Sequence, residues 1–138
     1  MPIQQTVLQQ QTRGRGFYRL DDDIEAFVRT SGMVSGLCNA FIQHTSASLI
    51  INENADPAVQ NDLERFISDL VIDGDSRFTH TAEGPDDMSA HVRSILTQTS
   101  LNIPVIDGRL ALGTWQSIYL WEHRTSAHLR KILLTISA

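Results

Sequence analysis

The stretch that determines the fold is HTSASLIINENADPAVQND, residues 44–62. Residues 37–44, which lead into it, have the pattern of a strand that ends at His44, with Cys38, Ala40, Ile42 and His44 on one face and Leu37 and Phe41 on the other. Residues 48–53 form a second apolar run, and its three consecutive aliphatic residues predict a strand in the interior of a sheet. Asp56-Pro57 is a strong helix start, because proline at the first helical position loses no hydrogen bond.

On the amino-terminal side of this stretch, the pattern predicts a hairpin followed by a helix. Residues 3–11 alternate like a strand, the sequence RGRG at 13–16 predicts a turn, and residues 17–20 return as a short strand. Asp21–Asp23 supply candidates for the N-cap of a helix that ends at Ser31-Gly32.

On the carboxyl-terminal side, two helices precede a series of strands. The first helix should bury Val59, Leu63, Phe66, Ile67 and Leu70, and a polar loop follows over 73–85. A second helix begins at Asp86 or Asp87, with an inward stripe that holds Met88, Val92, Ile95 and Leu96 and also includes His91. Strands are predicted at 101–106, 109–112, 115–123 and 129–137, with a turn at Asp107-Gly108. This order predicts an α+β fold, a largely antiparallel sheet covered by helices, in one domain over residues 1–138.

Composition narrows the class of protein. The formal net charge of −5 argues against a nucleic-acid partner, which selects for a basic face. Lys131 is the one lysine, and the other basic residues are arginines, which suit fixed recognition of carboxylate or phosphate. Cys38 is the one cysteine, no stretch approaches the ~18 apolar residues of a membrane span, and the first ten residues lack the pattern of a signal peptide. We therefore expect a cytoplasmic protein with no membrane partner.

Three histidines stand in polar or half-buried contexts: His44 at a strand end, His80 in a loop and His91 on a helix. Three imidazoles with an open fourth position describe a catalytic site of the zinc type. Their spacing matches no short metal-binding motif, so ordinary hydrogen-bonded histidines remain the alternative. For His123 and His128, a structural or surface role is the simpler reading.

Carboxylates and hydroxyls lie close to these histidines in the sequence. Glu83, Asp86 and Asp87 could hold Mg²⁺ together with a substrate phosphate, although helix capping explains the two aspartates equally well. The hydroxyls at positions 45, 46 and 48 could bind a phosphate or satisfy a turn. The chain contains no P-loop, dinucleotide-binding glycine motif or nucleophile elbow.

Three segments resemble the YjbQ-like family, whose members are described as secondary thiamine-phosphate synthases. They are QHTSASLIINENADPAV at 43–59, HTAEGPDDMSAHVRS at 80–94 and GRLALGTWQSIYLWEHR at 108–124. The resemblance implies two packed, mostly antiparallel β-sheets with flanking helices, assembled as a homotrimer. Ser89 is a departure, since many relatives have proline there, but it removes no ligand.

The resemblance also implies roles for individual residues. The metal ligands would be His44, His80 and His91, with zinc favoured and magnesium compatible with a phosphorylated substrate. The catalytic candidates are Glu53, Asp56 and Glu83. The residues expected to contact substrate are Thr45, Ser46, Ser48, Asp86, Asp87, Thr114 and Arg124, and Arg124 and Glu122 are also candidates for an ion pair at a pocket or a subunit interface.

The implied reaction joins an aminopyrimidine methyl diphosphate to a thiazole phosphate and releases pyrophosphate. A small phosphorylated metabolite would then be the partner, besides further copies of the chain. Two alternatives remain from the residues themselves: a non-catalytic trimer that captures a small phosphorylated metabolite, and a metal-dependent hydrolase.

Overall fold

Two antiparallel β-sheets and three α-helices make up the part of the chain that the computed structural model describes, residues 3–138. The elements follow the order predicted from the sequence. They are β1 (Ile3–Gln11), β2 (Gly16–Arg19), α1 (Asp21–Ser31), β3 (Gly36–Ile42), β4 (Ala47–Glu53), α2 (Pro57–Leu70), α3 (Asp87–Leu96), β5 (Ser100–Ile106), β6 (Arg109–Leu110), β7 (Gln116–Glu122) and β8 (Leu129–Ser137). The predicted α+β class is confirmed.

The larger sheet has the strand order β1-β8-β3-β5-β6, and the smaller has the order β2-β7-β4. The interior strand of the smaller sheet is β7, in which every residue after Gln116 is buried. The interior position predicted for β4 is therefore wrong. β4 lies at an edge, and its apolar residues are covered on both faces because layers pack above and below it rather than because it has two neighbours.

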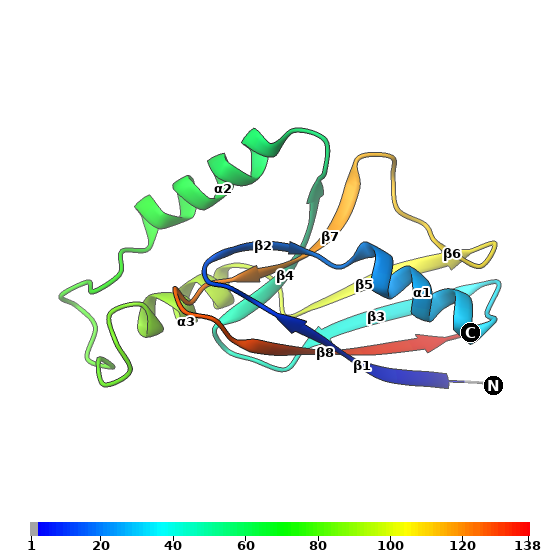
Figure 1. Cartoon of the computed structure of the whole chain (residues 1–138), viewed down its shortest axis with the longest axis horizontal. Coiled ribbons are helices and arrows are strands. Elements are labelled where there is room, and N and C mark those ends of the chain that lie inside the picture. Colours follow the sequence, from blue (N-terminus) through cyan, green and yellow to red (C-terminus); the bar gives the residue numbers. More distant parts are fainter. Residues whose placement is uncertain (1–2) are drawn as a thin grey trace.

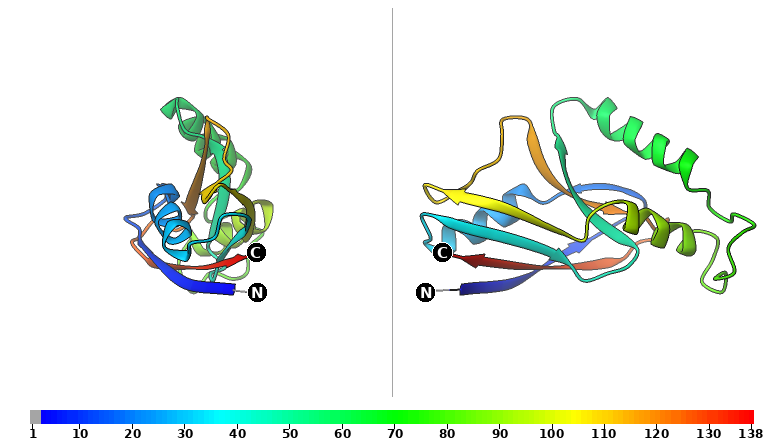
Figure 2. Two further views of the ribbon diagram at one scale, coloured as in Figure 1. Left: turned by 90° about the vertical axis from the view of Figure 1, so that its right-hand side faces the viewer. Right: turned by 180° about the vertical axis from the view of Figure 1, so that it is seen from behind.

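The main core lies between the two sheets and α1 (Figure 1). Leu49 and Leu120 point into it from the smaller sheet, and Ile24 and Val28 from α1. The opposite face of the smaller sheet carries Trp121, which packs with Ile67 of α2. Figure 2 shows α2 and α3 beyond this sheet, with α2 extending away from the body. The molecule is thus layered as the large sheet, the core with α1, the small sheet, and the helices α2 and α3.

Local sequence explains several boundaries. Asp56 accepts a hydrogen bond from the Ala58 amide at 2.9 Å and so caps α2, as predicted. Gly32 ends α1 in the left-handed conformation, with φ of 71°. The N-cap of α1 was predicted wrongly: Leu20 occupies it, and the Asp21 carboxylate instead accepts a hydrogen bond from the amide of Ile118 in β7.

The apolar stripe predicted for α2 is only partly buried. Ile67 is 8% exposed, whereas Phe66 is 68% and Leu70 58% exposed. The cause is the tilt of α2, which packs on the small sheet around Ile67 and Leu63 and leaves the rest of the stripe free.

The stripe predicted for α3 is only partly buried: Met88 and Val92 are half-buried, and Val92 packs against the core beside Trp121. Ile95 and Leu96 are 81% and 54% exposed, and the buried face carries Ala90 and the fully buried Arg93. Arg93 faces inward because the interior offers it a carboxylate and an imidazole, described below. No helix in residues 3–138 is long and apolar enough to cross a membrane.

Candidate functional site

The polar loop after α2 and the start of α3 are fixed to the turn between β7 and β8. Arg124, the second residue after β7, donates from Nε to Asp86 at 3.1 Å and from Nη1 to Asp87 at 2.9 Å. It also donates to the backbone carbonyl of Glu83 at 3.0 Å. The Thr125 amide adds a bond to Asp86 at 2.8 Å. One guanidinium therefore sets the position of the whole segment from 83 to 87.

This segment brings two predicted histidines together around one carboxylate. Asp87 Oδ2 lies 2.7 Å from His80 Nε2 and 3.1 Å from His91 Nε2. One donor atom from each of these three residues lies within 4.8 Å of the other two. Glu83 is at the edge of the group, with Oε2 3.2 Å from His80 Nε2.

Helix geometry and a backbone carbonyl orient His91. Asp87 and His91 are four residues apart on α3, so their side chains meet on one face. The Nδ1 of His91 lies 2.9 Å from the carbonyl oxygen of Thr45, and because a carbonyl can only accept, Nδ1 carries the proton. In the neutral ring, the lone pair is then on Nε2, the atom that faces Asp87.

The charges of the cluster support one another. The hydrogen bond with Asp87 raises the pKa of His80 above its usual value. Burial acts to raise the pKa of Asp87, but the hydrogen bond from His80 and the charge of Arg124 oppose it, and this pKa lies below its usual value. Burial likewise opposes the hydrogen bonds to Asp86, which prevail and lower its pKa to about 2. Both aspartates are ionised at neutral pH.

This donor set fits a divalent metal ion. Two imidazole nitrogens and one carboxylate oxygen are the ligands of catalytic zinc sites, which keep a further position open. The supporting contacts also fit, since His91 donates its other nitrogen to a carbonyl and the second oxygen of Asp87 is held by Arg124. Magnesium, which prefers oxygen, would be served by Asp87 with Glu83 beside it.

His44 lies outside this cluster. β3 ends at Ile42, so His44 belongs to the following connection rather than to the strand, contrary to the prediction. Its Nε2 accepts a hydrogen bond from the Lys131 amide at 2.8 Å. His44 and His91 line a common hollow, but His44 is not among the three residues whose ligand atoms converge.

The remaining predicted site residues lie at both ends of β4. Glu53 and Asp56 are at the far end, and because six residue steps separate Glu53 from Ala47, the distance along the strand is about 20 Å. Thr114 is exposed in the loop before β7, at the Glu53 end of the sheet. Thr45 contributes its carbonyl to His91, whereas the hydroxyls of Ser46 and Ser48 are engaged in the interior.

Comparison with known proteins agrees with this fold. A family model described as UPF0047 protein YjbQ-like matches residues 5–138. The chain belongs to the YjbQ-like family. A UPF0047 protein of Synechocystis sp. is 49% identical over 133 residues, covering 96% of this chain and 90% of the relative. The UPF0047 protein YjbQ of Escherichia coli O157:H7 is 42% identical over 133 residues, covering 96% of both.

Solved structures of the same family have the same architecture. An uncharacterized conserved protein of the YjbQ/UPF0047 family from Clostridium acetobutylicum superposes with a TM-score of 0.85 at 30% identity, covering 96% of this chain and 98% of that one. A YbjQ-like protein from Sulfolobus solfataricus gives the same TM-score at 22% identity over 98% of both chains, which shows the fold alone.

Sequence reasoning missed a buried polar network behind the cluster of this YjbQ-like chain. His123 is fully buried, with Nδ1 3.0 Å from Arg93 Nε and Nε2 2.8 Å from Ser48 Oγ. Arg93 also binds both carboxylate oxygens of Glu64, at 2.7 and 2.8 Å. Burial, with the charges of three nearby arginines, lowers the pKa of His123 to about 2. The sequence held no signal for this network, since its members are far apart and of ordinary surface types.

The Ser48–His123 pair has the composition of a nucleophile and a base but the wrong tautomer. An arginine Nε can only donate, so the Nδ1 of His123 must accept and carries no proton. The neutral ring then has its proton on Nε2, which donates to Ser48 instead of accepting from it. The pair is a structural link in the interior.

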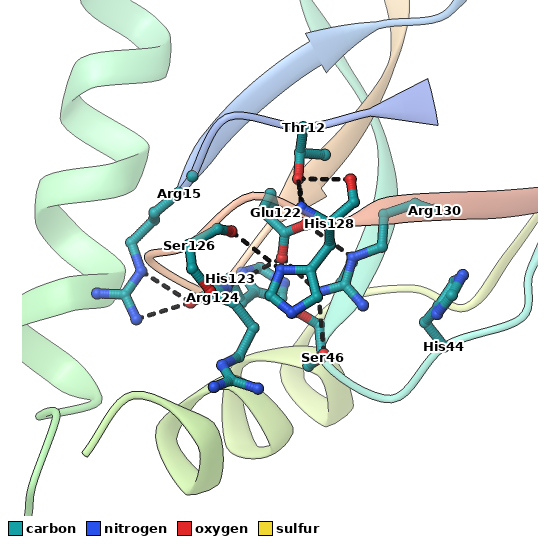
Figure 3. A network of polar contacts seen from close by, with 12 residues as sticks. Thr12, Arg15, His44, Ser46, Glu122, His123, Arg124, Ser126, His128 and Arg130 are labelled. Carbon is teal, nitrogen blue, oxygen red and sulfur yellow. Dashed lines mark hydrogen bonds and ion pairs between the residues drawn. The ribbon is translucent and has the colours of Figure 1, made fainter. Parts of the chain in front are cut away.

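A second buried network lies at the same end of the YjbQ-like fold (Figure 3). Glu122 pairs with Arg130 and accepts a hydrogen bond from Thr12 at 2.8 Å. Arg130 also donates to Ser46 at 3.0 Å, and Arg15 donates to the carbonyl of His123 at 2.7 Å. Figure 3 shows His44 apart from this network, beyond Arg130, and Arg124 directed toward α3. The side chains of Glu122 and Arg124 thus do not form the ion pair suggested by the sequence: Glu122 pairs with Arg130, Arg124 binds Asp86 and Asp87, and only the Arg124 backbone amide donates to Glu122, at 3.0 Å.

Proposed function

We propose that this YjbQ-like chain is a metal-dependent enzyme acting on a small phosphorylated metabolite, with a divalent ion held by His80, Asp87 and His91. The observation that carries the proposal is the convergence of three ligand atoms from separate turns of chain within 4.8 Å of one another. Two nitrogens and one oxygen favour zinc, and a phosphorylated substrate would also suit magnesium.

The reaction to be tested first is thiamine-phosphate synthesis, the activity that the resemblance implies. A bound cation would supply charge neutralisation for a leaving diphosphate. Glu83 is our candidate for proton transfer, because its carboxylate is 3.2 Å from His80. Glu53 and Asp56 are about 20 Å away along β4, so we assign them no role at this cluster.

A non-catalytic metabolite-binding protein is the second candidate. The observation that favours it is the tautomer of His123, which removes the Ser48–His123 pair from consideration as an activated nucleophile. In this alternative, the cation and the cluster hold a phosphate without turnover. A metal-dependent phosphoester hydrolase is a third use of the same geometry.

Metal content is the first experiment. Protein purified without chelators is expected to carry about one zinc ion per chain, and Asp87→Asn or His91→Ala should lose it, because each removes a ligand atom. His128→Ala is the matched control, since His128 binds the carbonyl of Ser126 at the protein surface. Wild-type protein with far less than one ion, or equal loss in the control, would remove the basis of the proposal.

Turnover then separates the candidates. Pyrophosphate release from aminopyrimidine methyl diphosphate and thiazole phosphate, abolished by His91→Ala, would support the synthase. Hydrolysis of a panel of phosphoesters without synthesis would support the hydrolase. Phosphate binding without either reaction would support the metabolite-binding protein.

We also propose that the chain assembles as a homotrimer, and the outer face of the large sheet supports an interface. An antiparallel sheet that faces water is normally polar on that side. Here the register aligns Val7, Leu133 and Phe41 in one row across β1, β8 and β3, and Ile3 and Leu37 in another. Ile3 is 64% and Phe41 43% exposed in the single chain, so association would remove apolar surface from water.

A further inference from the structure

A hollow of about 370 Å³ shares His91 with the metal-ligand cluster. The other residues that line it are His44, Thr45, Ser94, Ile95 and Thr99. Its volume lies within the range of about 300–1,000 Å³ that is usual for small-molecule sites. Since His80 and Asp87 do not line it, the hollow is a neighbour of the cluster and not the same cavity.

The hollow offers hydrogen-bond donors without charge. His44 accepts from the Lys131 amide through Nε2, so its neutral ring carries the proton on Nδ1, which has no hydrogen-bond partner among residues 3–138. Burial and the charge of Arg130 lower the pKa of His44, which keeps the ring neutral at neutral pH. Thr45 and Thr99 add exposed hydroxyl side chains.

The lining contains no carboxylate, ammonium or guanidinium group. Ile95 contributes an apolar wall, and at 81% exposure it is the most exposed of the large apolar residues on α3. Such a site suits a ligand group that is uncharged, partly apolar and able to accept a hydrogen bond. A free phosphate or a carboxylate would find no fixed positive charge there.

We propose that this hollow holds the uncharged, partly apolar end of a two-part ligand whose phosphate end lies at the His80–Asp87–His91 cluster. The inference rests on the proposed function, because the phosphate end requires the cation. His91 connects the two parts, since it lines the hollow and also contributes a ligand atom to the cluster. When both ends belong to one molecule, binding of the first end holds the second end close to its site. The joined ligand therefore binds more tightly than either end alone.

The test compares two probes on zinc-loaded protein by calorimetry: inorganic phosphate, which has only the charged end, and phenyl phosphate, which has both. We expect phenyl phosphate to bind about tenfold more tightly, since burial of an apolar group of this size is worth at least about 1.4 kcal/mol. The nitrogen chemical shifts of His44 should move with phenyl phosphate and not with inorganic phosphate.

A matched pair of variants on α3 locates the effect. Ile95→Ser should reduce the advantage of phenyl phosphate to about twofold, because it removes the apolar wall of the hollow. Leu96→Ser should keep the full advantage, since Leu96 is also exposed, at 54%, but does not line the hollow. Both variants should bind zinc and inorganic phosphate like the wild type, and light scattering checks that both keep its mass.

The outcomes distinguish this inference from the function on which it rests. Inorganic phosphate that binds, with no gain for phenyl phosphate or with equal loss in both variants, would overturn the inference and leave the metal proposal standing. Zinc-loaded protein that binds neither probe would overturn the phosphate-binding function and this inference together. Absence of zinc binding, measured first by metal content, would overturn the proposed function and this inference together.

Discussion

Because His123 is buried without a proton on Nδ1, the free energy of unfolding should fall as the pH is lowered. The folded protein holds its pKa at about 2, against a value of about 6.5 in an unfolded chain. Between these values the unfolded state binds a proton that the folded state does not, so stability falls as pH falls below 6.5. The loss from this one group between pH 7 and pH 5 is about 2 kcal/mol, and it continues at about 1.4 kcal/mol per unit below that.

Two other histidines act in the same range with known signs. The lowered pKa of His44 adds to the loss at low pH, whereas the raised pKa of His80 opposes it, since stability from a raised pKa is lost as pH rises. The contributions of His44 and His80 are the same in wild type and in His123→Gln, so they cancel in the difference between the two proteins. Glutamine does not titrate and can still offer an amide to Ser48.

Urea unfolding at pH 7 and pH 5 measures the difference. The wild type should lose about 2 kcal/mol more than His123→Gln over this interval. Nitrogen NMR of the histidine rings gives an independent reading, in which His123 stays neutral, with its proton on Nε2, down to pH 4. Parallel loss in both proteins, or protonation of His123 near pH 6, would refute the argument from burial and the Arg93 contact.

Three further predictions follow. Ser48→Ala should destabilise the fold by about 1–3 kcal/mol in urea unfolding, because it leaves the buried N–H of His123 unpaired, and should leave metal content unchanged. Arg124→Met should weaken zinc binding by about 10–100-fold in a chelator competition, since it releases Asp87, whereas Arg77→Met, which breaks an exposed ion pair in the preceding loop, should not. Phe41→Glu should shift the mass in light scattering from trimer toward monomer, and an unchanged mass would place the interface elsewhere.

The element order could be predicted from the sequence because each boundary carries a local signal. Asp56-Pro57 and Gly32 mark helix ends, and the left-handed residues Asp107 and Gly108, with φ of 52° and 74°, form the predicted turn between β5 and β6. Hydrophobic spacing identified α3 as a helix and placed Val92 inward, but it missed Arg93 and wrongly buried Ile95 and Leu96. Hydrophobic spacing cannot predict that Arg93 is buried, because the carboxylate and the imidazole that bind it come from distant parts of the sequence.

The cluster could be predicted only in part, for a related reason. The motif from 80 to 94 contains His80, Asp87 and His91. Asp87 and His91 are four residues apart, so the helix that begins within this motif puts their side chains on one face. The stretch from 44 to 62 is continuous in sequence but divided in space, because β4 carries its second half about 20 Å away. The concentration of polar residues between 44 and 62 therefore led to too many of them being assigned to one site.

The charges around the cluster fix an order of binding for the proposed ligands. Glu83, Asp86 and Asp87 bring three carboxylates to one place, and within residues 3–138 Arg124 is the one guanidinium that contacts them. With a neutral His91 the group stays net negative even when His80 is protonated, so it attracts a cation and repels a phosphate at short range. A divalent ion cancels the excess, and only then does the same place become favourable for an anion. Because Arg124 is already bound to both aspartates, it is not free to act as a phosphate clamp in the absence of the metal, and phosphate binding should follow metal binding.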